Sequence, residues 1–452
     1  MSVFDSLIER FAKEAPVAVM FRGLFANILA PQDIDAVFHD CAEKQYENEI
    51  LFSSVVELLA LAVTKQHPSL HSAYRRHKET LGVSVAALYD KLHGTELPVI
   101  RELVRRTAER MARVTRALGP LDAPLIEGYE TLVLDGFHLA GTEHRVLETR
   151  TLRGAPLPGL CLAVLDPQRR LIVDMYPCED GHAQERSLLP ELVNDLQPGK
   201  LWIMDRNFCT RMWLLEIALN KAFFIVRHHA AMPLELRGQR RSVGRVETGM
   251  LYEQTALIHG EDDESLEVRC LTLILDEPTA DGETQLVLLT NLPPQITART
   301  IAATYRQRWT IERAFGELTS SLHGEIDTLT YPPAALLACA IAFVVFNTLS
   351  VVKTAIGQVH GRAARDELST YHLATEIANV SSGLAIAVPF AEWRKRYAAL
   401  TAQELAKTLK SHARQVKLER YRKSPRGVKK PAPKRKGRKP HVSTARLLQK
   451  RK

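Results

Sequence analysis

Cysteine is scarce in this sequence, and no two cysteines stand close together. The six residues lie in apolar or strand-like surroundings, and none of them forms a C-x-x-C pair. We therefore expect neither a zinc site nor a disulfide framework. The cysteines are Cys41, Cys161, Cys178, Cys209, Cys270 and Cys339.

A secretory signal is also missing from the first residues. Asp5, Glu9 and Glu14 precede any apolar run, and no basic segment with a cleavage site follows, which predicts a cytoplasmic protein. No internal repeat is visible. With 46% hydrophobic and 25% charged residues, the 452-residue chain is expected to form about two to four globular domains.

Acidic residues are nearly absent from the C-terminal segment. Residues 411–452 contain 17 Lys and Arg but the single acid Glu419, so this segment carries +16, and the remaining 410 residues carry −8. The stretch 429–440 is rich in Lys, Arg and Pro, a composition that excludes a packed core and predicts a disordered basic tail. Nucleic acid is the expected partner, and an anionic membrane is disfavoured because the tail has no amphipathic apolar face.

Residues 1–125 are predicted to be helical. A core helix is expected over 55–63, and a charged helix after it ends at Gly82. Ser84 is a natural N-cap for a short second helix over 85–92. This pattern is compatible with a helix-turn-helix and equally with an ordinary two-helix hairpin.

From Tyr129 the helical period gives way to apolar, strand-like runs. Strands are predicted at 131–135, 159–165, 171–176, 201–205 and 223–226, with helices at about 184–196 and before the last strand. Asp135 and Asp205 end the first and fourth of these strands. The order of three strands, helix, strand, helix, strand in residues 126–226 is that of an RNase H-like domain of the α/β class, in which carboxylates at these two strand ends meet over one sheet edge.

Three further regions complete the predicted organisation. Residues 227–299 hold three more strand-like runs and are too long for one loop, so a mainly β insertion is expected. Residues 300–357 return to the core and include the apolar stretch 334–352. Polar residues at 347–350 interrupt that stretch, which favours a helix buried against the sheet over a membrane span. Residues 358–410 are predicted to be helical.

The stretch 305–318 has the pattern of one helix with two faces. Its apolar side is formed by Trp309, Ile311, Phe315, Leu318 and Leu322, so core packing is expected for the tryptophan. Tyr305, Arg308 and Glu312 fall on one polar stripe at i, i+3 and i+7, which would face a site. For this helix taken alone, an ordinary ion pair between Arg308 and Glu312 is the simpler explanation.

Three short segments form an ordered set that is more specific than any one of them. Residues 134–139 are Leu-Asp-Gly-Phe-His-Leu, residues 205–208 are Asp-Arg-Asn-Phe, and residues 305–312 carry the Tyr, Arg and Glu of the stripe. This set resembles the D-G-x-H-L, D-R-x-F and Y-(2)-R-(3)-E motifs of the IS4-class insertion-sequence transposases. The resemblance spans about residues 125–350.

The resemblance implies a DNA transposase that cuts and joins transposon ends through an Asp-Asp-Glu triad. It implies that the catalytic metal ligands are Asp135, Asp205 and Glu312, and that the DNA contacts are Tyr305, Arg308 and Arg206. It also implies double-stranded DNA with terminal inverted repeats as the substrate, a dimer that holds two ends, and bacterial, nucleoid-associated action. Residues 1–125 would then form part of the surface that recognises the DNA end.

Two aspartates and one glutamate that converge have a definite chemical use. Carboxylate oxygens are the ligands that Mg²⁺ and Mn²⁺ prefer. Two such ions can activate a nucleophile and stabilise the leaving oxygen of a displacement at phosphorus, so we expect two per active site. His138 and His144 are expected to be hydrogen-bonding or solvated residues and not metal ligands.

Two alternatives stay open. A non-catalytic DNA-binding protein derived from a transposase would also suit the basic tail and Thr319, where the family signature has lysine. Metal-dependent nicking of DNA distinguishes it from an active enzyme. A hydrolase for sugars or phosphate esters would use the carboxylates but leaves the tail without a role.

Thr319 generates a prediction at the sequence level. It lies seven residues after Glu312, about 10 Å along the same helix stripe, so it should face DNA beside the metal site. A lysine there would make a charge-assisted phosphate contact, roughly twice as strong as a neutral one. We expect Thr319→Lys to tighten binding to cleaved ends and to raise strand-transfer yield in single-turnover assays. No gain, together with a loss in Arg313→Ala or His323→Ala, would show that another residue makes this contact.

Overall fold

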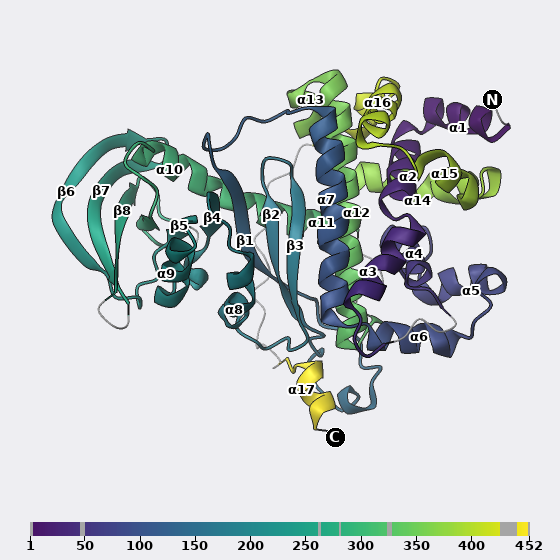
Figure 1. Ribbon diagram of the computed structural model, residues 1–452, viewed down its shortest axis with the longest axis horizontal. Coiled ribbons are helices and arrows are strands. Elements are labelled where there is room, and N and C mark those ends of the chain that lie inside the picture. Colours follow the sequence, from purple (N-terminus) through teal and green to yellow (C-terminus); the bar gives the residue numbers. More distant parts are fainter. Residues whose placement is uncertain are drawn as a thin grey trace.

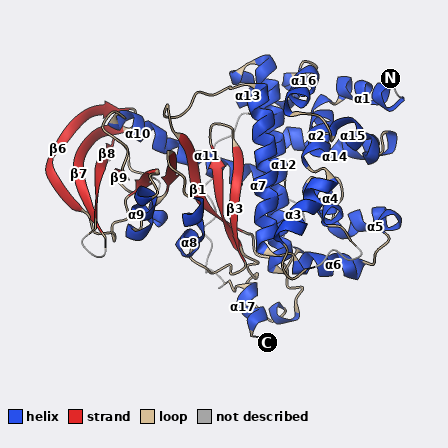
Figure 2. Ribbon diagram, viewed as in Figure 1, coloured by secondary structure: helices blue, strands red, loops and turns tan. Residues whose placement is uncertain are grey.

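A nine-stranded mixed sheet runs through the molecule, and most of the helices gather on one side of it (Figures 1 and 2). The computed structural model describes residues 3–45, 50–260, 264–279, 282–322, 328–424 and 441–450. The long helices α7 (Leu97–Leu118) and α12 (Pro332–His360) stand between the sheet and the helices of residues 3–94 and 370–413 (Figure 1). The predicted α/β class is confirmed.

The first five strands form the centre of the sheet in the order β3-β2-β1-β4-β5. They are β1 (Glu130–His138), β2 (Leu160–Asp166), β3 (Leu171–Cys178), β4 (Lys200–Met204) and β5 (Phe223–Arg227). β1 is parallel to β4 and β4 to β5, while β1 with β2 and β2 with β3 are antiparallel. All five predicted strands are confirmed, because apolar runs buried on both faces are a strong signal.

The two faces of the central strands are buried against different layers. Val133 of β1 belongs to the core that includes α7 and α12. Leu132 and Leu134 belong to a second core with α8 (Leu189–Leu192) and α9 (Arg211–Leu219). Because side chains alternate along a strand, Asp135 lies on the same face as Val133, the face that packs on α11 (Trp309–Ser321).

The segment between β3 and β4 differs from the single helix predicted over 184–196. It consists of the 3₁₀ turn Glu185–Leu188, the one-turn helix α8 and a second 3₁₀ turn, Val193–Asp195. Pro190 lies in the first turn of α8, where its missing N–H and fixed φ are tolerated. The proline therefore begins a separate helical turn, because inside a longer helix this position would need a backbone N–H to donate a hydrogen bond.

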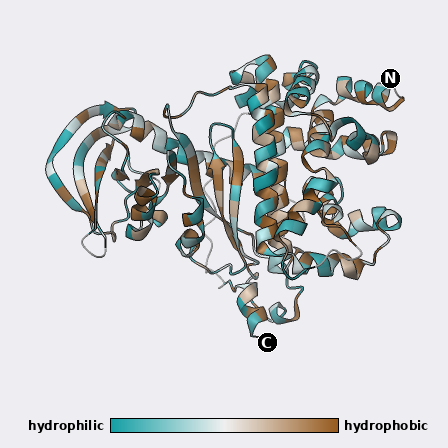
Figure 3. Ribbon diagram, viewed as in Figure 1, coloured by the Kyte–Doolittle hydropathy of each residue, from teal (hydrophilic) through white to brown (hydrophobic). Residues whose placement is uncertain are grey.

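Residues 227–299 extend the same sheet beyond β5. β9 pairs antiparallel with β5, and β8, β7 and β6 follow in order. These strands are β6 (Glu235–Val246), β7 (Gly249–His259), β8 (Ser265–Leu275) and β9 (Gln285–Thr290). β6 was not predicted from the sequence; it is an exposed edge strand with four arginines and is mostly hydrophilic in Figure 3. Arginines protect an exposed edge from further pairing, but they remove the apolar alternation that identifies a strand.

The N-terminal and C-terminal helices form one layer with a shared core. The Asn27 amide of α2 donates hydrogen bonds to the carbonyls of Tyr397 and Leu400, at 2.8 and 3.0 Å. Residues 1–125 and 358–410, treated above as separate segments, are therefore packed together. The helices of this layer, besides α7, are α1 (Val3–Glu14), α2 (Pro16–Ile28), α3 (Pro31–Cys41), α4 (Phe52–Val63), α5 (Leu70–Leu81), α6 (Val85–Gly94), α13 (Arg362–Glu367), α14 (Thr370–Ala387), α15 (Phe390–Tyr397) and α16 (Ala402–Ala413).

Helix α12 is the apolar stretch that the sequence placed inside the protein. It is long and apolar enough to cross a membrane, yet its most apolar window is entirely buried within the fold. The expectation of a buried helix is confirmed. Its polar interruption has a specific use, because the side chain of Asn347 bonds both backbone groups of Ile172 in the edge strand β3. Ile172 N–H donates to Asn347 Oδ1 and Asn347 Nδ2 donates to the Ile172 carbonyl, both at 2.7 Å.

The C-terminal segment is more ordered than its composition indicated. Tyr421 is buried, and the Ser369 N–H donates to its carbonyl at 2.7 Å. Further on, Ser443 pairs with Leu157, and α17 (Thr444–Gln449) follows. The prediction of a disordered tail over 411–452 is thus wrong for 411–424 and 441–450, because local composition does not reveal contacts with residues far away in the sequence. Residues 425–440 lie outside the described residues.

The contact between Asn347 and Ile172 predicts a large effect on stability. Asn347→Leu keeps the branched shape of the side chain but leaves a buried N–H and a buried carbonyl without partners. We expect the free energy of unfolding to fall by about 2–4 kcal/mol, measured by denaturant unfolding. Thr354→Ala is the matched control, since this buried hydroxyl bonds only to the Ser350 carbonyl of its own helix. Equal losses in the two variants would contradict the role of Asn347.

Candidate active site

The parallel pairing of β1 with β4 places the two predicted aspartates next to each other. Leu134 is opposite Met204 in this pair. Asp135 follows Leu134 in the chain, and Asp205 follows Met204. The Gly136 N–H donates to Asp135 Oδ1 at 2.9 Å, and the Asn207 N–H donates to Asp205 Oδ1 at 2.7 Å. Backbone donors therefore orient both carboxylates.

The Glu312 region is helical over the whole predicted stretch, with a 3₁₀ segment inside it. Helix α10 (Ala298–Tyr305) ends at the 3₁₀ turn Arg306–Arg308, and α11 begins at Trp309. Glu312 lies in the first turn of α11. Phe315, one turn further, packs on Phe137 of β1 with the ring centres 4.7 Å apart, and this contact fixes α11 against the strand that carries Asp135.

Trp309 does not pack in the core. Its side chain is 57% exposed, so the predicted core role is wrong. At 3.6 residues per turn, Trp309 lies roughly 200° around α11 from Ile311, so it faces away from the buried side of the helix. Ile311, Leu318 and Leu322 are buried as the periodicity predicts.

The guanidinium of Arg308 joins the candidate carboxylates. Its Nη1 lies 2.6 Å from Glu312 Oε1 and 3.5 Å from Asp135 Oδ2, and the side chain is 13% exposed. Burial opposes the charge of Arg308, but Tyr305, Glu312 and Asp135 together raise its pKa. Arg308 is thus the central cation of the cluster.

The two aspartates carry negative charge that the protein only partly compensates. Burial raises the pKa of Asp135 to about 7, and the charge of Asp205 adds to this rise while Arg308 opposes it. Burial also raises the pKa of Asp205. Among the described residues, no three His, Cys, Asp or Glu side chains are close enough to form a metal-binding group. The donor chemistry still fits a hard divalent cation, because the cluster offers only carboxylate oxygens and incompletely neutralised charge.

The predicted DNA contacts differ in accessibility. Tyr305 is 8% exposed, and burial raises the pKa of its hydroxyl to about 12. Arg206 is half-exposed and lies 2.9 Å from Glu283, which also pairs with Arg227. Only Arg206 among the three predicted contacts therefore presents a large exposed surface.

A carboxylate that the sequence analysis did not single out also belongs to this site. Glu185 follows β3 and is only 17% exposed. It accepts a hydrogen bond from the Asn207 amide at 2.5 Å and contacts His138 Nε2 at 3.2 Å. No motif or spacing marks Glu185, so only the fold could find it. His144 bonds the Thr149 carbonyl at 2.6 Å, as expected for a hydrogen-bonding histidine.

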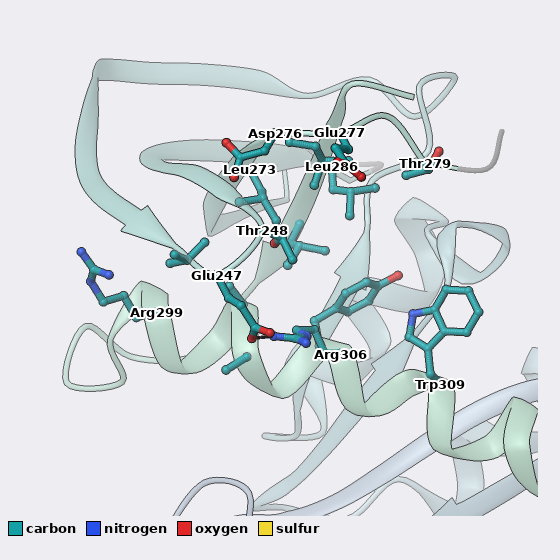
Figure 4. A pocket seen from close by; sticks show the side chains of 16 residues that line it. Glu247, Thr248, Leu273, Asp276, Glu277, Thr279, Leu286, Arg299, Arg306 and Trp309 are labelled. Carbon is teal, nitrogen blue, oxygen red and sulfur yellow. Dashed lines mark hydrogen bonds and ion pairs between the residues drawn. The ribbon is translucent and has the colours of Figure 1, made fainter. Parts of the chain in front are cut away.

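A cavity of about 800 Å³ borders the site between the β insertion and α10. Figure 4 shows Glu247, Thr248 and Asp276 on the strand side and Arg306 and Trp309 on the helix side. Arg306 forms an ion pair with Glu247 across it. Acidic and basic residues are both present, so the charge of the cavity does not indicate an anion site.

Thr319 is exposed near the end of α11. Its hydroxyl bonds the carbonyls of Phe315 and Gly316 at 3.0 and 3.2 Å. Arg313 Nε bonds the Trp309 carbonyl at 3.4 Å, and His323 lies outside the described residues. A lysine at position 319 would have room to extend into solvent.

The segment that carries this cluster matches a known protein family. Residues 127–348 match the family of transposase DDE domains. The matched segment contains Asp135, Asp205, Glu312 and the whole insertion. A "Putative transposase y4zB" from Sinorhizobium fredii (strain NBRC 101917 / NGR234) is 33% identical over 122 residues. That match covers 26% of this chain and spans about a third of the relative, 33% of its length.

The raised pKa of Asp135 predicts how its replacement changes stability. Folded Asp135 holds its proton more tightly than the unfolded chain does, so its contribution to stability is complete below pH 3.8 and declines as the pH rises to about 7. We expect Asp135→Asn, in EDTA, to raise the free energy of unfolding by about 1–3 kcal/mol at pH 8 and by less at pH 5. Thermal and denaturant unfolding measure this, with the exposed Asp276→Asn as the control. A gain of the same size at both pH values would contradict the buried charge.

Proposed function

We propose that this protein is a DNA transposase of the IS4 class that cuts and joins transposon ends with Asp135, Asp205 and Glu312. The observation that carries the proposal is the adjacency of Asp135 and Asp205 on parallel strands, with Arg308 linking Asp135 to Glu312. The match of residues 127–348 to transposase DDE domains supports it. The strand order β3-β2-β1-β4-β5 supports an RNase H-like core interrupted by the β insertion.

In this proposal Asp135, Asp205 and Glu312 would hold two Mg²⁺ or Mn²⁺ ions. The bound ions would supply a nucleophile and stabilise the leaving oxygen at phosphorus. The protein's own part is electrostatic, because Arg308 offsets the mutual repulsion of buried carboxylates. Arg308 and Arg206 would meet DNA phosphates, and Tyr305 would act through the neighbouring Arg308.

The rest of the chain has proposed roles around this core. Residues 1–125 would contribute to recognition of the transposon end, and the β insertion 227–299 would lie beside the cleaved strand. The segment 425–440 contains eight Lys and Arg and no acid, which suits non-specific affinity for DNA phosphates. We propose a dimer that holds two ends and acts on the bacterial nucleoid.

A non-catalytic DNA-binding protein derived from a transposase is the second candidate. Two observations favour it: Thr319 replaces the lysine of the family signature, and Arg308 lies within bonding distance of two of the three carboxylates. Such a protein would bind the same DNA without cutting it.

Replacement of the carboxylates tests the catalytic proposal. Asp135→Asn, Asp205→Asn and Glu312→Gln should each reduce DNA cleavage by about 100-fold or more, since even indirect support of a metal ligand is worth 10–100-fold. DNA binding should be largely unchanged. Cleavage is measured with Mg²⁺, Mn²⁺ and EDTA, and Glu109→Gln, an exposed carboxylate on α7, is the control.

The two candidates give different results in this assay. An active transposase shows metal-dependent cleavage that all three variants lose. Wild-type-like cleavage in any one variant would exclude that residue from the triad. DNA binding without metal-dependent cleavage in the wild type would favour the non-catalytic protein.

A further inference from the structure

Glu185 touches both motifs that carry the catalytic aspartates. Its Oε2 accepts a hydrogen bond from Asn207 Nδ2 at 2.5 Å, and its Oε1 lies 3.2 Å from His138 Nε2. His138 ends β1, and Asn207 lies in the turn after β4. One carboxylate from the segment after β3 therefore bridges two strand ends that are parallel neighbours in the sheet.

The same carboxylate rests directly on the backbone of β1 at Gly136. A Cβ atom built on Gly136 would lie 1.9 Å from Glu185 Oε1 and 2.3 Å from its Cδ. No side chain can occupy that position while Glu185 keeps its place. The glycine beside Asp135 thus allows Glu185 to approach the strand this closely.

Two of the residues that Glu185 contacts, Asn207 and Gly136, also orient a catalytic aspartate. Asn207 uses its side chain to bond Glu185 and its backbone N–H to bond Asp205. Gly136 contacts Glu185 and donates its N–H to Asp135. A shift of Glu185 would therefore move the backbone donors of both carboxylates at once.

We propose that Glu185 is a positioning residue that clamps the ends of β1 and β4 so that Asp135 and Asp205 present their oxygens together to a divalent cation. The proposal rests on the proposed transposase function. An ordinary surface pair between Glu185 and His138 would explain one contact only. It would not explain the Asn207 bond, the burial of Glu185 or the close approach to Gly136.

The clamp predicts a matched set of variants. Glu185→Ala should weaken Mn²⁺ binding by about 10–100-fold, as expected for a group that supports metal ligands, and reduce cleavage similarly. Glu185→Gln keeps an oxygen acceptor for Asn207 and should retain part of both. Gly136→Ala should resemble Glu185→Ala, because the new methyl group displaces the carboxylate.

A double variant with Glu185→Ala and Gly136→Ala distinguishes a loss of positioning from a general loss of structure. Once Glu185→Ala has removed the carboxylate, the methyl group of Gly136→Ala has space, so the double variant should bind Mn²⁺ no more weakly than either single variant. The full-length protein is titrated with Mn²⁺ by calorimetry, and thermal unfolding checks its integrity. Glu191→Ala, an exposed residue of α8, is the control.

Each result decides between distinct conclusions. If Glu185→Ala binds Mn²⁺ like the wild type while Asp135→Asn does not, the clamp is wrong and the transposase proposal stands. If Asp135→Asn also binds Mn²⁺ and cleaves DNA like the wild type, both proposals fail. If Glu185→Ala does not fold, Glu185→Gln and Gly136→Ala decide, and wild-type Mn²⁺ affinity in both overturns the clamp.

Discussion

The parallel pairing of β1 with β4 is the constraint on which the candidate site depends. Parallel neighbours end at the same edge of a sheet, so residues 70 positions apart in the sequence become adjacent through the pairing of Leu134 with Met204. Every other part of the site is arranged around that edge. Helix α11 brings Glu312 from one side, and the turn after β3 brings Glu185 from another.

The buried carboxylates at this edge affect the stability of the folded protein. Asp135, Asp205 and Glu185 are all mostly buried, and their mutual repulsion is offset mainly by Arg308 and hydrogen bonds. Burial disfavours the ionised forms of Asp135 and Asp205 and raises the pKa of each, whereas hydrogen bonds from His138 and Asn207 lower the pKa of Glu185 despite its burial. A divalent cation bound as in the proposed function would relieve the same repulsion, so the lower stability without metal would be matched by affinity for the cation.

Helix α12 provides the rigid support behind the site. Asn347 fixes it to the edge strand β3, and its Lys353 lies 3.2 Å from Glu317 on α11. Burial lowers the pKa of Lys353, which the charge of Glu317 opposes. Together with the tilted ring contact between Phe315 and Phe137, these interactions hold α11 at a defined position over β1, so Glu312 and Arg308 are presented from a stable element.

The sequence by itself determined the central strands and the buried helix α12, because apolar runs and turn residues are local signals. It also placed Asp205 directly after β4, whereas β1 continues beyond Asp135 to His138. The role of Glu312 is a prediction from the spacing of Tyr305, Arg308 and Glu312 and the resemblance built on it. Only the tertiary structure decided the place of Arg308 between carboxylates, the contact of Glu185 with Gly136, the edge strand β6 and the docking of 441–450. These features depend on residues that are distant in sequence, and periodicity along the chain carries no information about which side chains meet across elements.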